Sequence, residues 1–408
     1  MVSKYDIFEI VYKNKGPMKP KEVRANFKNV EYNTIHMALV SLQKIGLLVK
    51  TKYGFEVKSD KKSTLLYNLI SYCLQNNINH NLLLDKNLIQ FISHALQQGE
   101  ITSKNSKLNS KTLQKYVSIL SNYGLLLIIS QKPLKVKVFY NSLIKNLLIF
   151  FDLNVFVKPD KIDYLPFIKK ELTAFKSLRE KNEAGYQLLV QKLEISFVHH
   201  SLSLEGNPIT LPDTFKLLQH QITPANISTE SLNEVLNYQK AILQMLTDNG
   251  RLTLQRILEY HRVSMNHRPN IAGLIRSGKV FIRGNPAFIL AEPDEIELKL
   301  QALLEKYNLF FDKKKKSVNE IIEFAAYFHN EFQHIHPFED GNSRTTRLLT
   351  FYILRSESIL VLDLPFGLLD EYMNNTKNSL KRDDKQLSHN LQKVVFYNLI
   401  TVNRKLRS

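Results

Sequence analysis

The segment HPFEDGNSRTTR, residues 336–347, combines a histidine, two acids, an asparagine and two arginines within twelve positions. His336 can take up a proton near neutral pH without unusual tuning of its pKa. Asp340 offers a hard carboxylate of the kind that binds Mg²⁺ together with phosphate groups. Arg344 and Arg347 are three residues apart and therefore share one face of a helix. A base, a metal-binding carboxylate and paired arginines together indicate phosphoryl or nucleotidyl transfer.

The flanking residues predict how this segment is held. Apolar residues from Ile321 to Ile335 recur at helical spacing and predict a buried helix that delivers His336 at its end. Pro337 stops that helix, because a residue before proline is pushed out of helical geometry. A turn at Gly341 and Asn342 then leads into a second helix. The N–H groups at a helix start bind anions, so the two arginines beside them suit a polyphosphate.

Composition limits the class of protein. A chain of 408 residues with 44% hydrophobic and 23% charged residues is an ordinary globular protein of two or three domains. Its single cysteine, Cys73, excludes an internal disulfide and a cysteine-rich zinc site. The most apolar stretch, 143–157, is interrupted by Lys145 and Asp152 and is shorter than the roughly 20 residues of a membrane span. We expect a cytoplasmic protein with no membrane segment.

The net charge of +18 is unevenly distributed. Residues 1–150 contain 22 Lys and Arg against 8 Asp and Glu, whereas the remaining 258 residues contain 34 against 30. A basic region attached to a nearly neutral one predicts a nucleic-acid-binding module joined to a second domain.

A weak internal repeat at an offset of 78 residues relates 36–50 to 114–128. Each copy predicts an amphipathic helix, a glycine cap and an apolar strand. With the helices upstream, residues 1–60 resemble a winged helix-turn-helix domain, and 61–156 resemble a second one. Such domains place a helix in the DNA major groove, or they serve in dimerisation and protein docking, and both possibilities stay open. The candidate DNA contacts are Asn33, Thr34 and His36 in the first copy and Lys111 and Lys115 in the second.

The twelve-residue segment resembles the signature of the Fic family, H-x-F-x-[DE]-G-N-[GK]-R-x-x-R, and departs from it at Ser343. The resemblance extends to AGLIRSGKVFIRG (272–284), which looks like the family's flap, a segment that aligns the target chain over the active site. It implies an all-helical Fic domain over 157–408 with a short β-hairpin flap that includes Val280, Phe281 and Ile282. The whole chain is thus expected to be mainly α, with small β wings in the winged-helix modules.

The resemblance also implies residue roles. His336 would deprotonate a Ser, Thr or Tyr hydroxyl of a target protein, and Phe338 would pack beneath the loop. Asp340 would bind Mg²⁺ that bridges phosphates of ATP. The product would be an AMP-modified protein, together with pyrophosphate.

Four residues of the loop would hold the nucleotide phosphates. Gly341 and Asn342 would form the anion hole around the α-phosphate, and Arg344 and Arg347 would hold the β- and γ-phosphates. Ser343 adds a Cβ and a hydroxyl where the family has glycine or lysine. It could donate a hydrogen bond to phosphate, lower the rate or alter the nucleotide used, and we expect activity to survive.

A second stretch, HHSLSLEGNPIT (199–210), resembles the family's inhibitory helix, [ST]-x-x-x-E-[GN], at Ser201, Glu205 and Gly206. By resemblance Glu205 would pair with Arg347 and hold ATP in an unproductive pose, with the inhibitory helix near 196–207. The sequence therefore predicts a self-inhibited protein adenylyltransferase. The alternatives are a Fic enzyme that transfers or removes another phosphate-containing group, and a transcriptional regulator whose Fic core senses nucleotide. Two-fold DNA sites and inhibition across subunits also make a homodimer plausible.

Overall fold

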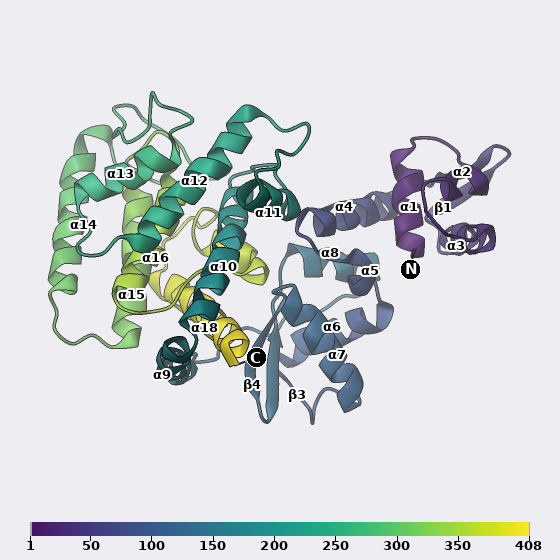
Figure 1. The fold of residues 1–408 in the computed structure, drawn as a ribbon, viewed down its shortest axis with the longest axis horizontal. Helices are drawn as coiled ribbons and strands as arrows, with labels where there is room; N and C mark the ends of the chain where they lie inside the picture. The colour runs from purple at the N-terminus through teal and green to yellow at the C-terminus, as the bar shows by residue number, and fades with distance from the viewer. Residues whose placement is uncertain (1, 408) are drawn as a thin grey trace. The chain divides into compact units, whose positions relative to one another are not determined.

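The computed structural model describes residues 2–407, and most of them lie in helices (Figure 1). The mainly helical fold predicted from the sequence is confirmed. Cα packing divides the chain into two compact units. Unit 1 contains Met1–Tyr123 and Pro133–Pro159, and unit 2 contains Gly124–Lys132 and Asp160–Ser408. The predicted domain boundaries near residues 60 and 156 stay predictions.

The N-terminal part of unit 1 has three helices followed by a hairpin. These are α1 (Lys4–Lys13), α2 (Pro20–Arg24), α3 (Tyr32–Lys44), β1 (Leu48–Thr51) and β2 (Gly54–Val57). The Ser3 side chain accepts hydrogen bonds from the first-turn amides of α1, which fixes where this helix begins. The hairpin is antiparallel, with Leu48 opposite Val57. This order of elements is the one expected from the sequence, and its assignment as a winged helix stays a prediction.

The remainder of unit 1 is also mostly helical. It contains α4 (Lys61–Gln75), α5 (His80–Leu83), α6 (Lys86–Gln98), β3 (Ile101–Thr102), α7 (Ser110–Asn122), β5 (Leu134–Val138) and α8 (Ser142–Phe150). β3 pairs with β5 antiparallel, with Ile101 opposite Val136. Within residues 2–407, the helices are all too short or too polar to cross a membrane.

The internal repeat is visible in the backbone. α7 begins and ends 78 residues after α3 does. Gly46 and Gly124 follow these helices with φ of 77° and 66°, a region that favours glycine. The strand after Gly124, β4 (Leu126–Gln131), begins 78 residues after β1. Both copies therefore have the predicted order of helix, glycine and strand.

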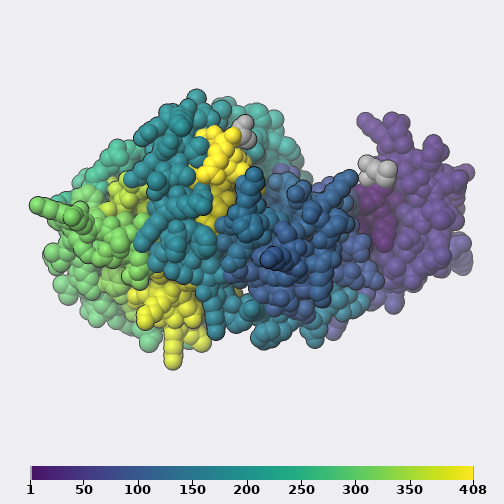
Figure 2. All heavy atoms as spheres, turned by 90° about the horizontal axis from the view of Figure 1, so that it is seen from below, coloured from purple at the N-terminus to yellow at the C-terminus, as the bar shows by residue number. Residues whose placement is uncertain are grey.

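Unit 2 is a helical domain built around a buried central helix, α16 (Asn342–Ser356). α16 packs against α10, α12, α13 and α15, and α18 packs against α9 and α15. Part of α18 is visible in yellow at the surface (Figure 2). The other elements of the unit are β4, α9 (Leu165–Lys181), α10 (Glu183–Ser203), α11 (Leu211–His220), α12 (Thr229–Thr247), α13 (Leu254–Ser264), η1 (Pro293–Glu295), α14 (Ile296–Phe311), α15 (Val318–Ile335), η2 (Phe366–Leu368), α17 (Leu369–Asn375) and α18 (Asp384–Arg407).

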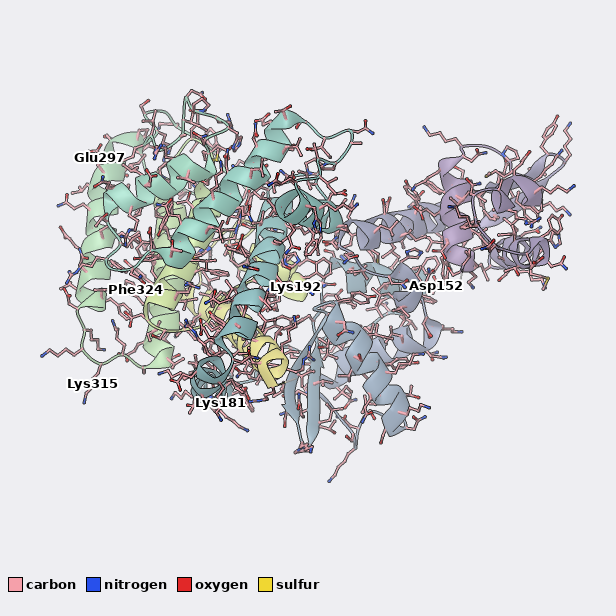
Figure 3. All side chains as sticks on the ribbon, in the orientation of Figure 1. Asp152, Lys181, Lys192, Glu297, Lys315 and Phe324 are labelled. Carbon is pink, nitrogen blue, oxygen red and sulfur yellow. The ribbon has the colours of Figure 1, made fainter. Side chains whose placement is uncertain are left out.

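The segment between α13 and η1 differs from the expected β-hairpin. The only pairing there among the described residues is one antiparallel bridge, between Ile282 and Asn285. The hairpin prediction is therefore wrong, and Pro286, which has no N–H to donate to a ladder, is one physical reason. The lysine-rich run between α14 and α15 is a loop, and Figure 3 shows Lys315 pointing away from the domain.

Candidate active site

His336 lies at the end of α15, where the helix gives way to the loop. It is the C-cap residue and has left-handed backbone angles, φ 49° and ψ 60°. Its Nδ1 lies 3.3 Å from the carbonyl oxygen of Gln333, and because a carbonyl only accepts, Nδ1 carries the proton. Nε2 is then the nitrogen that can accept a proton. Burial lowers the pKa of His336 to about 4, so the ring is neutral at pH 7.

A buried arginine holds the backbone on which His336 sits. The Arg276 N–H donates to the carbonyl of Pro337 over 2.9 Å. The Arg276 guanidinium donates to four more main-chain oxygens, those of His336 (2.7 Å), Gly278 (2.8 Å), Ala291 (2.6 Å) and Ile335 (3.5 Å). One side chain therefore ties the loop to both ends of the flap segment.

Phe338 and Asn342 shape the turn between the two helices. Phe338 is fully buried and stacks face to face on His261, with ring centroids 3.6 Å apart. The Asn342 side chain accepts from the Phe338 N–H (2.9 Å) and donates to the Phe338 carbonyl (2.7 Å). His261 Nε2 lies 2.9 Å from the Asp340 carbonyl oxygen, and His261 Nδ1 accepts from the Gly273 N–H. The Asn342 side chain is thus used within the loop, which leaves its backbone N–H for a ligand.

The start of α16 offers unpaired amides. Gly341 precedes the helix with φ 78°, and a Cβ there would approach Met265 to 2.9 Å. The first intrahelical bond runs from the Thr345 N–H to the Gly341 carbonyl. In the part of the chain that the structure describes, the N–H groups of Asn342, Ser343 and Arg344 have no acceptor, as expected for a first helical turn. Unpaired amides of this kind can bind an anion, and anion binding at this helix start stays a prediction.

Asp340 lies between two arginines. Its carboxylate accepts from Arg268 Nη1 (2.7 Å) and from Arg344 Nη2 (3.0 Å), and also from the Gly341 N–H. Burial alone would raise the pKa of Asp340, but the Arg344 charge and the Gly341 amide outweigh it, and the pKa is lowered. Asp340 is therefore ionised at neutral pH.

Arg344 is buried and is shared by two acids. Its second contact is an ion pair with Glu234 of α12. Glu234 also accepts from the Asn207 side chain over 2.7 Å, and Asn207 directly follows the predicted inhibitory motif. Arg344 is therefore linked to α12 and, through Asn207, to the turn after α10.

Arg347 is only 2% exposed and donates hydrogen bonds to Ser201 and Glu205. Nε donates to Ser201 Oγ (2.6 Å), and Nη2 donates to the Ser201 carbonyl (2.9 Å) and to Glu205 Oε1 (2.9 Å). Ser201 Oγ in turn donates to the Tyr238 hydroxyl over 2.8 Å. Glu205 lies in the turn just after α10, and Gly206 follows with φ 91°. The arginine predicted to hold phosphate is thus occupied by the carboxylate predicted to block it.

Glu205 has a second cation on its other oxygen. Lys377 Nζ lies 3.2 Å from Glu205 Oε2. Burial alone would raise the pKa of Glu205, but Arg347 and then Lys377 bring it below its usual value. The Asn285 side chain of the flap donates to the carbonyls of Lys377 (3.0 Å) and Ser379 (2.9 Å). The flap and Glu205 therefore both contact the loop that carries Lys377.

The predicted flap residues differ in exposure. Ile282 is buried, Val280 is partly buried, and Phe281 is 75% exposed. Sequence reasoning missed several residues that hold the site. They are Arg276, Arg268, Glu234, Tyr238, His261 and Lys377.

The predicted DNA contacts lie in unit 1, on helices away from the loop residues in sequence. Asn33 and Thr34 are exposed in the first turn of α3, and Lys111 and Lys115 are exposed on α7. His36 is partly buried and lies edge-on to Phe55 of the hairpin. Four of the five candidates are therefore open to a partner.

Comparison with known proteins identifies the loop-bearing domain. Residues 251–354 match the model of the Fic/DOC family. The protein adenylyltransferase Fic of Drosophila persimilis is 31% identical over 193 residues, which are 46% of this chain and 34% of that protein. The protein of the same name from Drosophila melanogaster is 32% identical over 175 residues, 42% of this chain and 32% of that protein. The chain thus spans about a third of the length of these relatives.

A solved structure supports the fold. The Fic domain containing signaling protein from Bacteroides thetaiotaomicron superposes with a TM-score of 0.53 and 23% identity, over 59% of this chain and 98% of that one. At this identity the likeness concerns the fold alone. The family match over residues 251–354 assigns a Fic/DOC domain to unit 2, and the solved structure has a similar fold.

Proposed function

We propose that this chain is a protein adenylyltransferase that moves AMP from ATP to a Ser, Thr or Tyr hydroxyl of a target protein, and that Glu205 holds it in a resting state. The observation that carries the proposal is the buried ion pair of Glu205 with Arg347, 2.9 Å long, beside a neutral His336. The similarity to proteins named protein adenylyltransferase Fic supports the reaction type.

In this proposal His336 transfers the proton, and the start of α16 binds the phosphates. The target hydroxyl oxygen forms a bond to the α-phosphorus of ATP, the bond from that phosphorus to the bridging oxygen breaks, and pyrophosphate leaves. His336 Nε2 takes the hydroxyl proton, which the neutral ring permits. The free amides of Asn342, Ser343 and Arg344 face the phosphate charge at the start of α16.

Mg²⁺ fits this donor set. In proteins Mg²⁺ is usually held by one or two carboxylates and by substrate phosphates, with water completing its shell. Asp340 is ionised, partly exposed and supplies one such carboxylate. No group of three or more His, Cys, Asp or Glu within residues 2–407 forms a metal cage, so phosphates would have to complete the site. A bound Mg²⁺ would neutralise phosphate charge as pyrophosphate departs.

The Glu205 contact supports the proposed resting state. With Arg347 bound to Glu205 and Ser201, its guanidinium is not available to a γ-phosphate. A bound ATP would lack that cation and would not be oriented for attack. Removing the Glu205 carboxylate should release Arg347 from its ion pair, while its hydrogen bonds to Ser201 remain.

The experiment is incubation of a Glu205→Gly protein with Mg²⁺ and ATP labelled on the α-phosphate, followed by intact-mass analysis. We expect a gain of AMP on the protein and release of pyrophosphate. The matched control is the Glu205→Gly, His336→Ala protein, which should bind ATP and gain no AMP. An absent adduct in the first protein, with ATP still bound, would favour nucleotide sensing over transfer.

We also propose that the N-terminal region binds double-stranded DNA, supported by its excess of 22 basic over 8 acidic residues in 1–150. Exposed Lys111 and Lys115 lie one helical turn apart on α7. Affinity should fall with salt, with a log–log slope of about −0.9 for each neutralised phosphate. The double variant Lys111→Met, Lys115→Met should make the total log–log slope less negative by about 2. Absence of binding at low salt would make the region a protein-docking or dimerisation module instead.

A further inference from the structure

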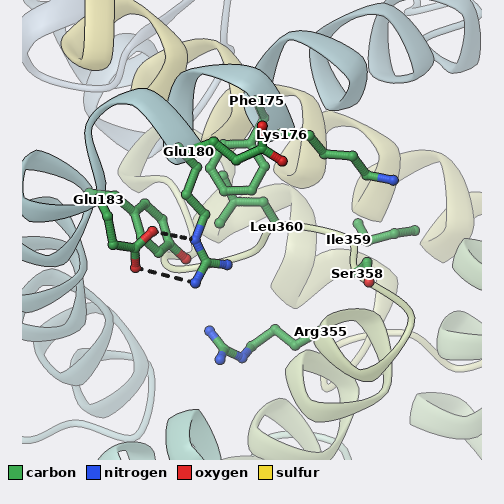
Figure 4. A pocket seen from close by; sticks show the side chains of 10 residues that line it. Phe175, Lys176, Glu180, Glu183, Arg355, Ser358, Ile359 and Leu360 are labelled. Atoms are coloured by element: carbon green, nitrogen blue, oxygen red, sulfur yellow. Dashed lines mark hydrogen bonds and ion pairs between the residues drawn. The ribbon is translucent and has the colours of Figure 1, made fainter.

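A cavity lies in unit 2, outside the residues of the loop and the flap. It has a volume of about 370 Å³ and is formed by α9, the start of α10 and the end of α16 (Figure 4). Buried Phe175 and Tyr186 contribute aromatic walls, with rings in a T-shaped contact at 5.5 Å. Buried Ile359 and Leu360 add apolar surface. A volume of this size is in the range of small-molecule sites.

Arg355 gives the cavity an uncompensated positive charge. Its guanidinium donates to the Leu246 carbonyl over 2.9 Å and contacts the Tyr186 hydroxyl, and both of these partners are neutral. Among residues 2–407, no carboxylate lies within 4.0 Å of Arg355. Burial lowers the pKa of Arg355, because it disfavours the charged guanidinium. Figure 4 shows Arg355 apart from Glu180 and Glu183, with no dashed line to either.

The acids of the cavity do not neutralise Arg355. Glu183 accepts two hydrogen bonds from Arg179, at 2.8 and 3.3 Å, and one from Gln187. Arg179 also lies over the Tyr186 ring, 4.6 Å from its centroid. Glu180 is exposed, and so is Lys176 on the same helix. The cavity is thus lined by three cations, Lys176, Arg179 and Arg355, and by two acids. Of these acids, Glu183 is already paired with Arg179.

We propose that this cavity binds a small molecule that carries a phosphate or carboxylate group on an apolar or aromatic body. The anionic group would pair with the Arg355 fork, for which planar or tetrahedral oxyanions are the favoured partners. The body would lie against Tyr186 and Phe175. The site is separate from the proposed nucleotide site, since it shares none of its lining residues with the 336–347 loop.

The cavity also touches the two helices that carry the resting contact. Tyr186 lies near the start of α10, which ends at Ser203 beside Glu205, and Arg355 lies at the end of α16, which begins near Arg347. The helices pack through stacked Phe197 and Phe351, with centroids 4.5 Å apart. A ligand that bridges them should favour the resting arrangement and slow transfer. This regulatory part rests on the proposed function, whereas binding does not.

The test is calorimetric titration of the full chain with phenyl phosphate, benzoate and inorganic phosphate. We expect saturable binding of phenyl phosphate or benzoate, tighter than that of inorganic phosphate, and a loss of at least about 10-fold in Arg355→Met. Arg344→Met, which alters the start of α16, should keep this binding. Binding that is lost in Arg344→Met and kept in Arg355→Met would place the ligand at the nucleotide site and overturn the proposal.

A second variant tests the same cavity in case Arg355→Met does not fold. Lys176→Glu changes an exposed side chain, so the protein should fold, and the added negative charge should weaken binding several-fold. No saturable binding of any of the three probes to the native chain would also overturn the proposal. If phenyl phosphate binds at this cavity but leaves the AMP transfer rate of the native chain unchanged, the regulatory part is wrong.

Discussion

Lys377 allows the resting contact to be weakened without being removed, because it binds the second oxygen of Glu205 and lies outside the 336–347 loop. Its side chain is 23% exposed and lies 3.2 Å from Glu205 Oε2. Lys377→Met leaves Glu205 with Arg347 as its remaining ion-pair partner. A partly exposed pair of this kind contributes about 1 kcal/mol, which corresponds to roughly a 5-fold change in an equilibrium. We therefore expect AMP transfer to rise about 5-fold in Lys377→Met.

The assay is the initial rate of AMP incorporation at saturating Mg²⁺ and ATP. Lys381→Met is the matched control, since it removes an exposed lysine from the same loop and should leave the rate unchanged. In the Glu205→Gly background, Lys377→Met should give no further rise, because the contact that it weakens is already gone. An unchanged or slower Lys377→Met protein, or an equal rise in Lys381→Met, would refute the reasoning.

Three further outcomes follow from the site. Because the pKa of His336 is lowered to about 4, the neutral ring persists as the pH falls from 8, and kcat/KM of the Glu205→Gly protein should stay level until the pH approaches 4; an acid limb near 6.5 would contradict this. Asn342→Ala removes two buried hydrogen bonds to Phe338, so the free energy of unfolding should fall by about 1–3 kcal/mol in chemical denaturation and transfer should drop. Ser343→Gly should fold and transfer AMP at a rate close to that of its parent, measured in the Glu205→Gly background; a loss as large as that of Asn342→Ala would show that the serine hydroxyl is needed.

The local architecture of the loop could be predicted because short-range rules determine it. Pro337 ends the preceding helix, and Gly341 takes a φ of 78° just before α16 begins. The repeat in the N-terminal region was also readable, since Gly46 and Gly124 mark the same position in two similar helix–strand segments. These features depend on residues adjacent in sequence.

The residues that support the loop come from distant parts of the chain and could not be read from spacing. Arg268 reaches Asp340 across 72 residues, and Lys377 reaches Glu205 across 172. A lone arginine or lysine carries no sequence signal for such a contact. The Glu205–Arg347 pair was predicted only because the family resemblance supplied it.

The flap shows how tertiary contacts can override a local pattern. The family resemblance implied a hairpin there, and the β-branched residues Val280 and Ile282 are of a type that favours strands. Instead, the Arg276 guanidinium and the Asn285 side chain bind main-chain carbonyls and hold the segment without a strand ladder. The hydrogen bonds that a hairpin would make are thereby replaced by side-chain donors.

The most direct test of the central claim is the ratio of AMP self-incorporation rates of the Glu205→Gly and native chains, at saturating Mg²⁺ and ATP. A coupling of roughly 1–3 kcal/mol between Glu205 and the phosphate-binding arginine predicts a ratio of about 5–150. A ratio of one, with both proteins binding ATP, would contradict the assignment of Glu205 as the brake on Arg347.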